Sequence, residues 1–161
     1  MALDLQWIAN ACGARKARVN ERIQSLWSGY GELVRVVLDG GPCDSVIVKW
    51  VNPPAVKRDV SHERKCRSYA VETAWYSDFA VRCDDTCRVP KMIAKRVGPA
   101  RDERILILED LDSIGFDRRT HRPNSPQIES CLSWLASFHA RFLGEAPNGL
   151  WKTGTYWHLS T

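Results

Sequence analysis

A lysine lies in the middle of an otherwise apolar segment, Ser45–Val51 (SVIVKWV). β-Branched residues dominate this segment and apolar side chains fall on both of its faces, which is typical of a buried strand. The period of two places Lys49 on the same face as Ile47 and Val51. An ammonium group in such surroundings needs an anion. Taken alone, a lysine whose charged end reaches solvent from an edge strand is the simpler interpretation.

One candidate anion for Lys49 is a phosphate held by the loop Ser28-Gly29-Tyr30-Gly31. Its glycines permit backbone angles and close approaches that other residues cannot make. The alternative is that this loop is only a hairpin turn between two strands.

The other candidate anion is Glu72, on a helix predicted from about His62 to Ala80 with Ser61 as its cap. Glu72 recurs with aromatic residues at steps of three and four, so it lies on the apolar face of that helix. Glu63 is the rival acid. Nine residues at about 100° each place Glu63 on the opposite side, so Glu72 is the expected partner of Lys49.

The remaining pattern predicts a leading helix, four more strands and a final helix. These are expected at Asp4 to about Cys12, then Arg18–Trp27, Glu32–Leu38, Lys91–Val97 and Ile105–Leu108, and from the cap Ser125 with Pro126 up to Gly144. The fold class is therefore α+β, with a five-stranded antiparallel sheet, a helix inserted after the third strand and further helices at both ends. The final helix is expected to bury a stripe formed by Ile128, Leu132, Leu135, Phe138 and Phe142.

Composition excludes several classes of protein. The net charge of +4 arises from basic residues scattered among nearly as many acids, which does not indicate nucleic-acid binding. No apolar run approaches the roughly 20 residues that span a membrane, and the first residues lack the pattern of a secretory signal, so a cytoplasmic location is expected. The six cysteines are irregularly spaced, as reduced thiols are. Cys83 and Cys87 could form half of a zinc site, but no second pair at matching spacing accompanies them.

A glycine loop between two strands, a lysine on the third, an acid on the next helix and a connector after the fifth strand occur in the order of a kinase small lobe. The segments themselves resemble the aminoglycoside phosphotransferase and choline kinase superfamily, most closely its ecdysteroid-kinase-like (CHK kinase-like) branch. The resemblance runs from about Gln24 to the end and is carried by Ser25–Gly31, Val46–Lys49, Ser68–Glu72, Ile105–Leu111 with Gly115-Phe116, and Trp134–Ala140.

This resemblance implies an ATP site. Lys49 would meet the phosphates and Glu72 would pair with it, while Ser28, Gly29, Tyr30 and Gly31 would close over the triphosphate. Glu109, Asp110 and Leu111 would hold adenine through backbone groups. Residues 1–124 would form the ATP-binding lobe with its leading helix, and residues 125–161 would form the first helix and the start of a truncated C-terminal lobe. An alternative role for Glu109, Asp110 and Asp112 as a Mg²⁺ site is weaker, because metal ligands normally converge from separate elements.

The resemblance also implies a catalytic loop of the form His-x-Asp in the large lobe. None of the four histidines has an aspartate two residues later. Neither a catalytic residue nor a metal ligand is therefore assigned in this chain, and the Mg²⁺ ligands are expected in the large lobe. His139 lies on the apolar stripe of the final helix and is interpreted as a packed structural histidine.

The expected activity of the whole enzyme is transfer of the ATP γ-phosphate to a hydroxyl group of a small substrate, with this chain inactive alone. The alternative is a non-catalytic domain that keeps the scaffold and binds a protein partner. In that case an apolar patch formed by Phe138, Phe142, Trp151 and Trp157 would drive association, including self-association.

Overall fold

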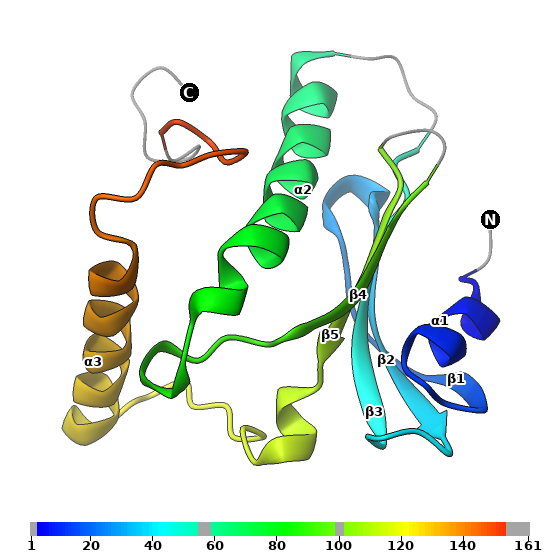
Figure 1. Cartoon of the computed structure of the whole chain (residues 1–161), viewed down its shortest axis with the longest axis horizontal. Coiled ribbons are helices and arrows are strands. Elements are labelled where there is room, and N and C mark those ends of the chain that lie inside the picture. Colours follow the sequence, from blue (N-terminus) through cyan, green and yellow to red (C-terminus); the bar gives the residue numbers. More distant parts are fainter. Residues whose placement is uncertain (1–2, 55–58, 99–101, 154–161) are drawn as a thin grey trace. The chain divides into compact units, whose positions relative to one another are not determined.

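The computed structural model describes residues 3–54, 59–98 and 102–153 (Figure 1). The helices are α1 (Leu5–Ala11), α2 (Val60–Asp78) and α3 (Ser125–Phe142); the strands are β1 (Lys16–Ser25), β2 (Gly31–Asp39), β3 (Ser45–Val51), β4 (Met92–Val97) and β5 (Arg104–Glu109). The described residues form two compact units. The first lies within Met1–Tyr69 and Pro90–Arg118, and the second within Ala70–Val89 and Arg119–Thr161. Helix α2 contributes its N-terminal half to the first unit and its C-terminal half to the second.

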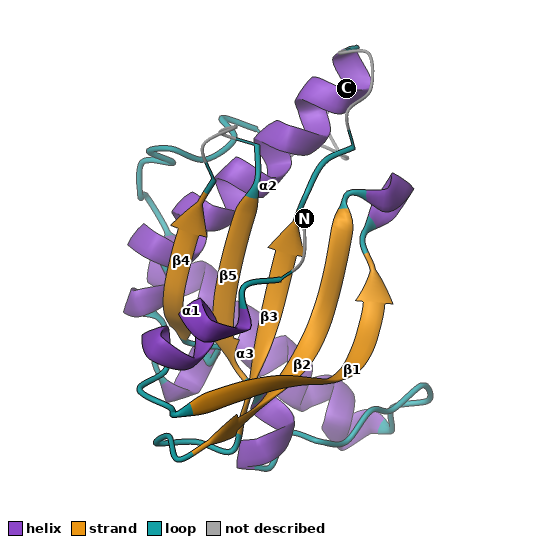
Figure 2. Ribbon diagram, turned by 90° about the vertical axis from the view of Figure 1, so that its right-hand side faces the viewer, coloured by secondary structure: helices purple, strands orange, loops and turns teal. Residues whose placement is uncertain are grey.

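The first unit is built on one antiparallel sheet of five strands in the order β1-β2-β3-β5-β4 (Figure 2). The predicted α+β class, the five-stranded sheet and the helix after the third strand are confirmed. Strand β3 is the middle strand and is bonded on both sides. The interpretation of Lys49 as a residue of an edge strand is therefore wrong.

Helix α1 covers one face of the sheet (Figure 2). The alternation of β2, β3 and β5 brings apolar side chains to this face, where they surround Ile8 of α1. The completely or almost completely buried members are Val34, Val36, Val46, Val48, Ile105 and Ile107. Asp4 caps α1 by accepting the Trp7 N–H at 3.0 Å, and it pairs with Arg96 of β4 at 2.9 Å. Both contacts lower the pKa of Asp4.

The opposite face of the sheet carries the N-terminal half of α2. Here Cys66 of α2 packs with Leu26, Tyr30 and Val51, and Tyr69 lies half-buried against them. Lys49 is on this face, because β3 alternates and the buried Val46 and Val48 face α1.

The second unit is held together by aromatic packing of α3 against the C-terminal half of α2 and Phe79, the residue that follows α2. Trp75 lies 6.2 Å from Phe138 and Phe79 lies 6.1 Å from Phe142, measured between ring centroids. The Trp134 indole N–H donates to the Arg88 carbonyl at 2.9 Å. These contacts leave Phe138 and Phe142 of the apolar stripe half-buried.

The remaining apolar residues of α3 are not buried as predicted. Ile128, Leu132 and Leu135 are 45%, 59% and 40% exposed. A helical period identifies an apolar face but does not supply a partner for it. His139 is also exposed rather than packed, and its ring lies 6.3 Å from that of Phe138.

Neither serine predicted as a helix cap has that role, because the capping residue lies two positions earlier at α2 and one position earlier at α3. Helix α2 begins at Val60, so Ser61 lies inside it, and the Asp59 carboxylate accepts the His62 N–H at 2.7 Å. Asn124 rather than Ser125 caps α3, because it forms a reciprocal capping box with Gln127. In the described part of the chain, no helix combines the length and the apolar character needed to cross a membrane.

Candidate functional site

Lys49 lies between two apolar neighbours on the face that carries α2. Its direct partners across the sheet are Leu33 of β2 and Leu106 of β5, and Leu106 is buried. Lys49 is half-buried, and its ammonium stands 5.3 Å from the centroid of the Tyr69 ring on α2. An ammonium over an aromatic face gains a cation–π attraction, and the surrounding leucines limit its contact with water.

The glycine loop is a tight turn between β1 and β2. Ser28, Gly29 and Gly31 all have positive φ angles, of 57°, 74° and 130°. The Leu26 N–H closes the turn on the Gly31 carbonyl at 2.8 Å. A Cβ atom on Gly31 would overlap the Trp50 carbonyl oxygen, so this position requires glycine. The segment is thus a hairpin turn, and its conformation depends on glycine for a definite steric reason.

Tyr30 anchors this turn to the rest of the first unit. Its side chain is buried, and its carbonyl accepts the Asn52 N–H at 2.8 Å. Its hydroxyl lies 2.8 Å from Nδ1 of His62 on α2. Burial is the main cause that raises the pKa of Tyr30, so the hydroxyl stays protonated at neutral pH.

A second lysine stands beside the turn. Lys65 of α2 donates to the Ser28 hydroxyl at 3.1 Å, and its ammonium lies 5.0 Å from the Tyr30 ring centroid. The sequence interpretation did not include Lys65. The available signal was its position four residues before Tyr69, which places both on one side of the helix. Strand β3 and the N-terminal half of α2 therefore each contribute one ammonium group, from Lys49 and Lys65, on the same face of the sheet.

Glu72 is half-buried on the C-terminal half of α2, in the second unit. Burial raises the pKa of the neighbouring Tyr76, and the charge of Glu72 adds to that effect. The pairing of Glu72 with Lys49 joins residues of different units and stays a prediction. The rival acid Glu63 is exposed, in agreement with its predicted position on the opposite side of the helix.

Strand β5 ends at Glu109, whose N–H donates to the Lys91 carbonyl at 2.8 Å, and the connector follows it. Asp110 is buried, with 2% of its surface exposed. Its carboxylate accepts from Arg35 Nε of β2 and from the Ser45 hydroxyl of β3, each at 2.7 Å. Leu111 starts a short 3-10 helix, so its N–H has no acceptor within that helix.

Arg35 organises the acids of the connector. It pairs with Asp110 at 2.7 Å, with Asp112 at 2.6 Å and with Glu21 of β1. The hydrogen bond to Asp110 is the main cause that raises the pKa of Arg35. Because one guanidinium binds both Asp110 and Asp112, these two carboxylates have a structural partner, which weakens their alternative interpretation as Mg²⁺ ligands.

The pairing register of β3 shows the order of the glycine turn, Lys49 and the connector along the strand. Gly31 pairs with Val51 at one end of the strand, and Glu109 pairs with Val46 at the other. Five residues of extended strand separate the two ends by roughly 17 Å. Lys49 lies between them. The turn, the lysine and the connector thus follow one another along β3.

Cys83 and Cys87 belong to the second unit and are free thiols. Burial, together with the neighbouring Cys87, raises the pKa of Cys83 to about 11. Within the described ranges, the residues grouped closely enough to hold a metal ion are His62, Cys66 and Asp102.

Comparisons of the chain with protein-family models, with curated proteins and with solved structures found no match. The resemblance to the phosphotransferase superfamily therefore stays a prediction.

Proposed function

We propose that this chain is the ATP-binding small lobe of a small-molecule kinase that phosphorylates a hydroxyl group. The observation that carries this proposal is the position of Lys49. It is a lysine on the middle strand of the sheet, between Leu33 and Leu106, on the face that also carries the glycine turn and α2.

The order of the parts supports the proposal. The turn joins the first two strands, the lysine is on the third, a helix follows at once and a connector leaves the fifth. In kinases these parts cover the phosphates, neutralise them, position the lysine and bind the nucleotide. The finer fold that we propose is accordingly a protein-kinase-like small lobe.

In this proposal the phosphates lie near Lys49 and the turn Ser28–Gly31, where Lys65 adds a second positive charge. Adenine lies at the other end of β3, against Glu109–Leu111. The Asp110 carboxylate is bound to Arg35 and Ser45, so adenine contacts would come from backbone groups such as the Leu111 N–H. Glu72 follows Tyr69 by three residues on α2, which places it on the side of the helix that bears Tyr69 and suits it to orient Lys49.

The 161 residues contain no His-x-Asp sequence. The role proposed for this chain is therefore nucleotide binding, in a cytoplasmic enzyme whose catalytic aspartate and Mg²⁺ ligands lie in a further lobe. Mg²⁺ would enter this site with the nucleotide phosphates.

Calorimetric titration of the chain with Mg-ATP tests the proposal. Lys49→Ala should weaken binding at least tenfold, which corresponds to about 1.4 kcal/mol, because the phosphates lose their central cation. Lys16→Ala is the matched control, since Lys16 is exposed at the start of the edge strand β1. The assignment would be contradicted if Lys49→Ala bound Mg-ATP as tightly as the wild type does. It would also be contradicted if Lys49→Ala and Lys16→Ala lost equal amounts of affinity.

The exposed apolar face of α3 favours a second candidate, a non-catalytic domain that binds a protein partner. Ile128, Leu132 and Leu135 recur at steps of four and three and are all exposed. This exposed face is not the apolar patch predicted from the sequence. Of the predicted residues, Phe138 and Phe142 are half-buried in the aromatic cluster, and Trp157 lies outside the described residues. Sedimentation of the wild type should then show concentration-dependent association that Leu132→Glu abolishes and that Mg-ATP does not alter.

A further inference from the structure

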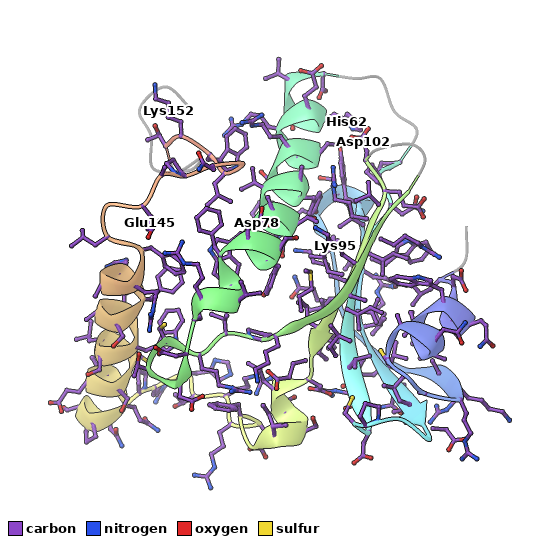
Figure 3. The ribbon with its side chains drawn as sticks, viewed as in Figure 1. His62, Asp78, Lys95, Asp102, Glu145 and Lys152 are labelled. Carbon is purple, nitrogen blue, oxygen red and sulfur yellow. The ribbon has the colours of Figure 1, made fainter. Side chains whose placement is uncertain are left out.

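Three side chains with metal-binding atoms meet in the first unit, beside the glycine turn. His62 and Cys66 are four residues apart on α2 and therefore share one side of the helix. Asp102 reaches them from just before β5, and Figure 3 shows its label beside that of His62. The imidazole, thiol and carboxylate atoms all lie within 4.8 Å of one another. His62 and Cys66 are buried and Asp102 is half-buried.

The contacts of His62 distinguish its two ring nitrogens. Nδ1 lies 2.8 Å from the Tyr30 hydroxyl, and Nε2 lies 3.5 Å from Cys66 Sγ. A nitrogen and a sulfur bound to one tetrahedral zinc ion, at their usual bond lengths, stand about 3.6 Å apart. Nε2 and Sγ therefore already have the separation of two zinc ligands.

The Tyr30 contact completes a pattern common to metal-bound histidines. Such a histidine usually donates its other N–H to an oxygen, which fixes the ring and its tautomer. Here Nδ1–H can donate to the Tyr30 oxygen while Nε2 faces Cys66.

We propose that His62 Nε2, Cys66 Sγ and the Asp102 carboxylate bind a zinc ion. A thiolate and an imidazole suit Zn²⁺, whereas Mg²⁺ and Ca²⁺ require oxygen ligands. As the zinc–sulfur bond forms, the Cys66 thiol releases its proton to solvent. Three protein ligands leave a fourth tetrahedral position for a water molecule. The ion would join α2, the β4–β5 connection and, through Tyr30, the glycine turn.

Titration of the metal-free full chain with Co²⁺, a spectroscopic substitute for zinc, tests this site. We expect one ion per chain, with the absorption of a tetrahedral cobalt centre, a thiolate-to-cobalt charge-transfer band, and displacement of both signals by Zn²⁺. Cys66→Ser should abolish the charge-transfer band and weaken binding at least tenfold. The matched control is Cys83→Ser/Cys87→Ser, which should bind as the wild type does.

Two further variants separate metal binding from folding. Asp102→Asn changes a half-buried side chain and should weaken binding at least tenfold while the far-ultraviolet circular dichroism stays unchanged. Tyr30→Phe should keep the charge-transfer band and lower affinity about 10- to 100-fold, because it removes only the support of His62. The proposal is overturned by absence of a thiolate band in the wild type, by wild-type affinity in Cys66→Ser or Asp102→Asn, or by loss of the band in the Cys83/Cys87 control.

Discussion

Individual residues of the glycine turn have different steric requirements. Gly29 has a φ of +74° and open space where a Cβ would lie. Gly31 has a φ of +130°, and a Cβ there would overlap the carbonyl oxygen of Trp50 on β3. The backbone of β3 thus leaves no room for a side chain at Gly31, the residue that ends the turn.

Alanine substitutions should separate these two requirements. We expect Gly31→Ala to lower the free energy of unfolding by about 3 kcal/mol or more, since strain at a positive φ is added to a backbone overlap. Gly29→Ala should cost about 1 kcal/mol, because only the φ preference is lost. Urea titration followed by circular dichroism measures both values. Equal losses would mean that the overlap with Trp50 is relieved at little cost.

The face of Lys49 could be predicted from the sequence because strand alternation is local and requires no knowledge of neighbours. Arg35 could not be identified in the same way. Its partner Asp110 is separated from it by 75 residues, and nothing in the sequence near either residue indicates the pair. The His62–Cys66 spacing was visible on the predicted helix. Asp102, from another element, is what turns that spacing into a candidate metal site.

At the scale of elements, Arg35 joins three parts of the first unit. It lies on β2, pairs with Glu21 of β1 and holds the connector through Asp110 and Asp112. The connector therefore keeps its course through a largely buried ionic contact, and the backbone groups of Asp110 and Leu111 depend on it for their position.

Removing the guanidinium should be costly. Arg35→Met leaves the Asp110 carboxylate buried without its cation, and we expect the free energy of unfolding to fall by about 3–5 kcal/mol. Arg15→Met is the matched control, because the Arg15–Asp39 pair is 75% and 60% exposed, and it should cost less than about 1 kcal/mol. Chemical denaturation of the two variants compares the costs directly. A small loss in Arg35→Met would show that the Ser45 hydroxyl and the backbone satisfy Asp110 alone.

The order and type of the elements could be predicted because each strand and helix carries its own period. The residues at which the helices begin could be predicted less well. Asp59 lies two residues before Ser61 and Asn124 directly before Ser125, and each serine is also a favourable cap. Only for α3 does the sequence carry a further signal, the three-residue spacing from Asn124 to Gln127 that forms the capping box. Burial of the α3 stripe was overestimated for another reason. Ile128, Leu132 and Leu135 are apolar in sequence, but their burial depends on tertiary contacts that a helical period does not contain.

At the scale of the whole molecule, the division into two units predicts where a nucleotide should act. The proposed phosphate and adenine contacts, apart from Glu72, all lie in the first unit, whereas α3 lies in the second. A ligand that binds only the folded first unit suppresses the openings that expose its amides. The nucleotide should therefore slow amide hydrogen exchange in the first unit and leave exchange in α3 largely unchanged.

Hydrogen exchange with and without Mg-ADP measures this distribution. At a nucleotide concentration of 100 times the Kd, amides that exchange through opening of the binding region should slow by up to about 100-fold. We expect this protection in the turn around Gly29, in β3 and in the connector, with little change in α3. Lys49→Ala, which is expected to bind at least tenfold more weakly, should at the same nucleotide concentration keep at most about a tenth of this slowing, and without nucleotide it should exchange as the wild type does. Protection confined to α3 would place the nucleotide on the second unit and contradict the role assigned to Lys49, because no proposed phosphate contact lies there.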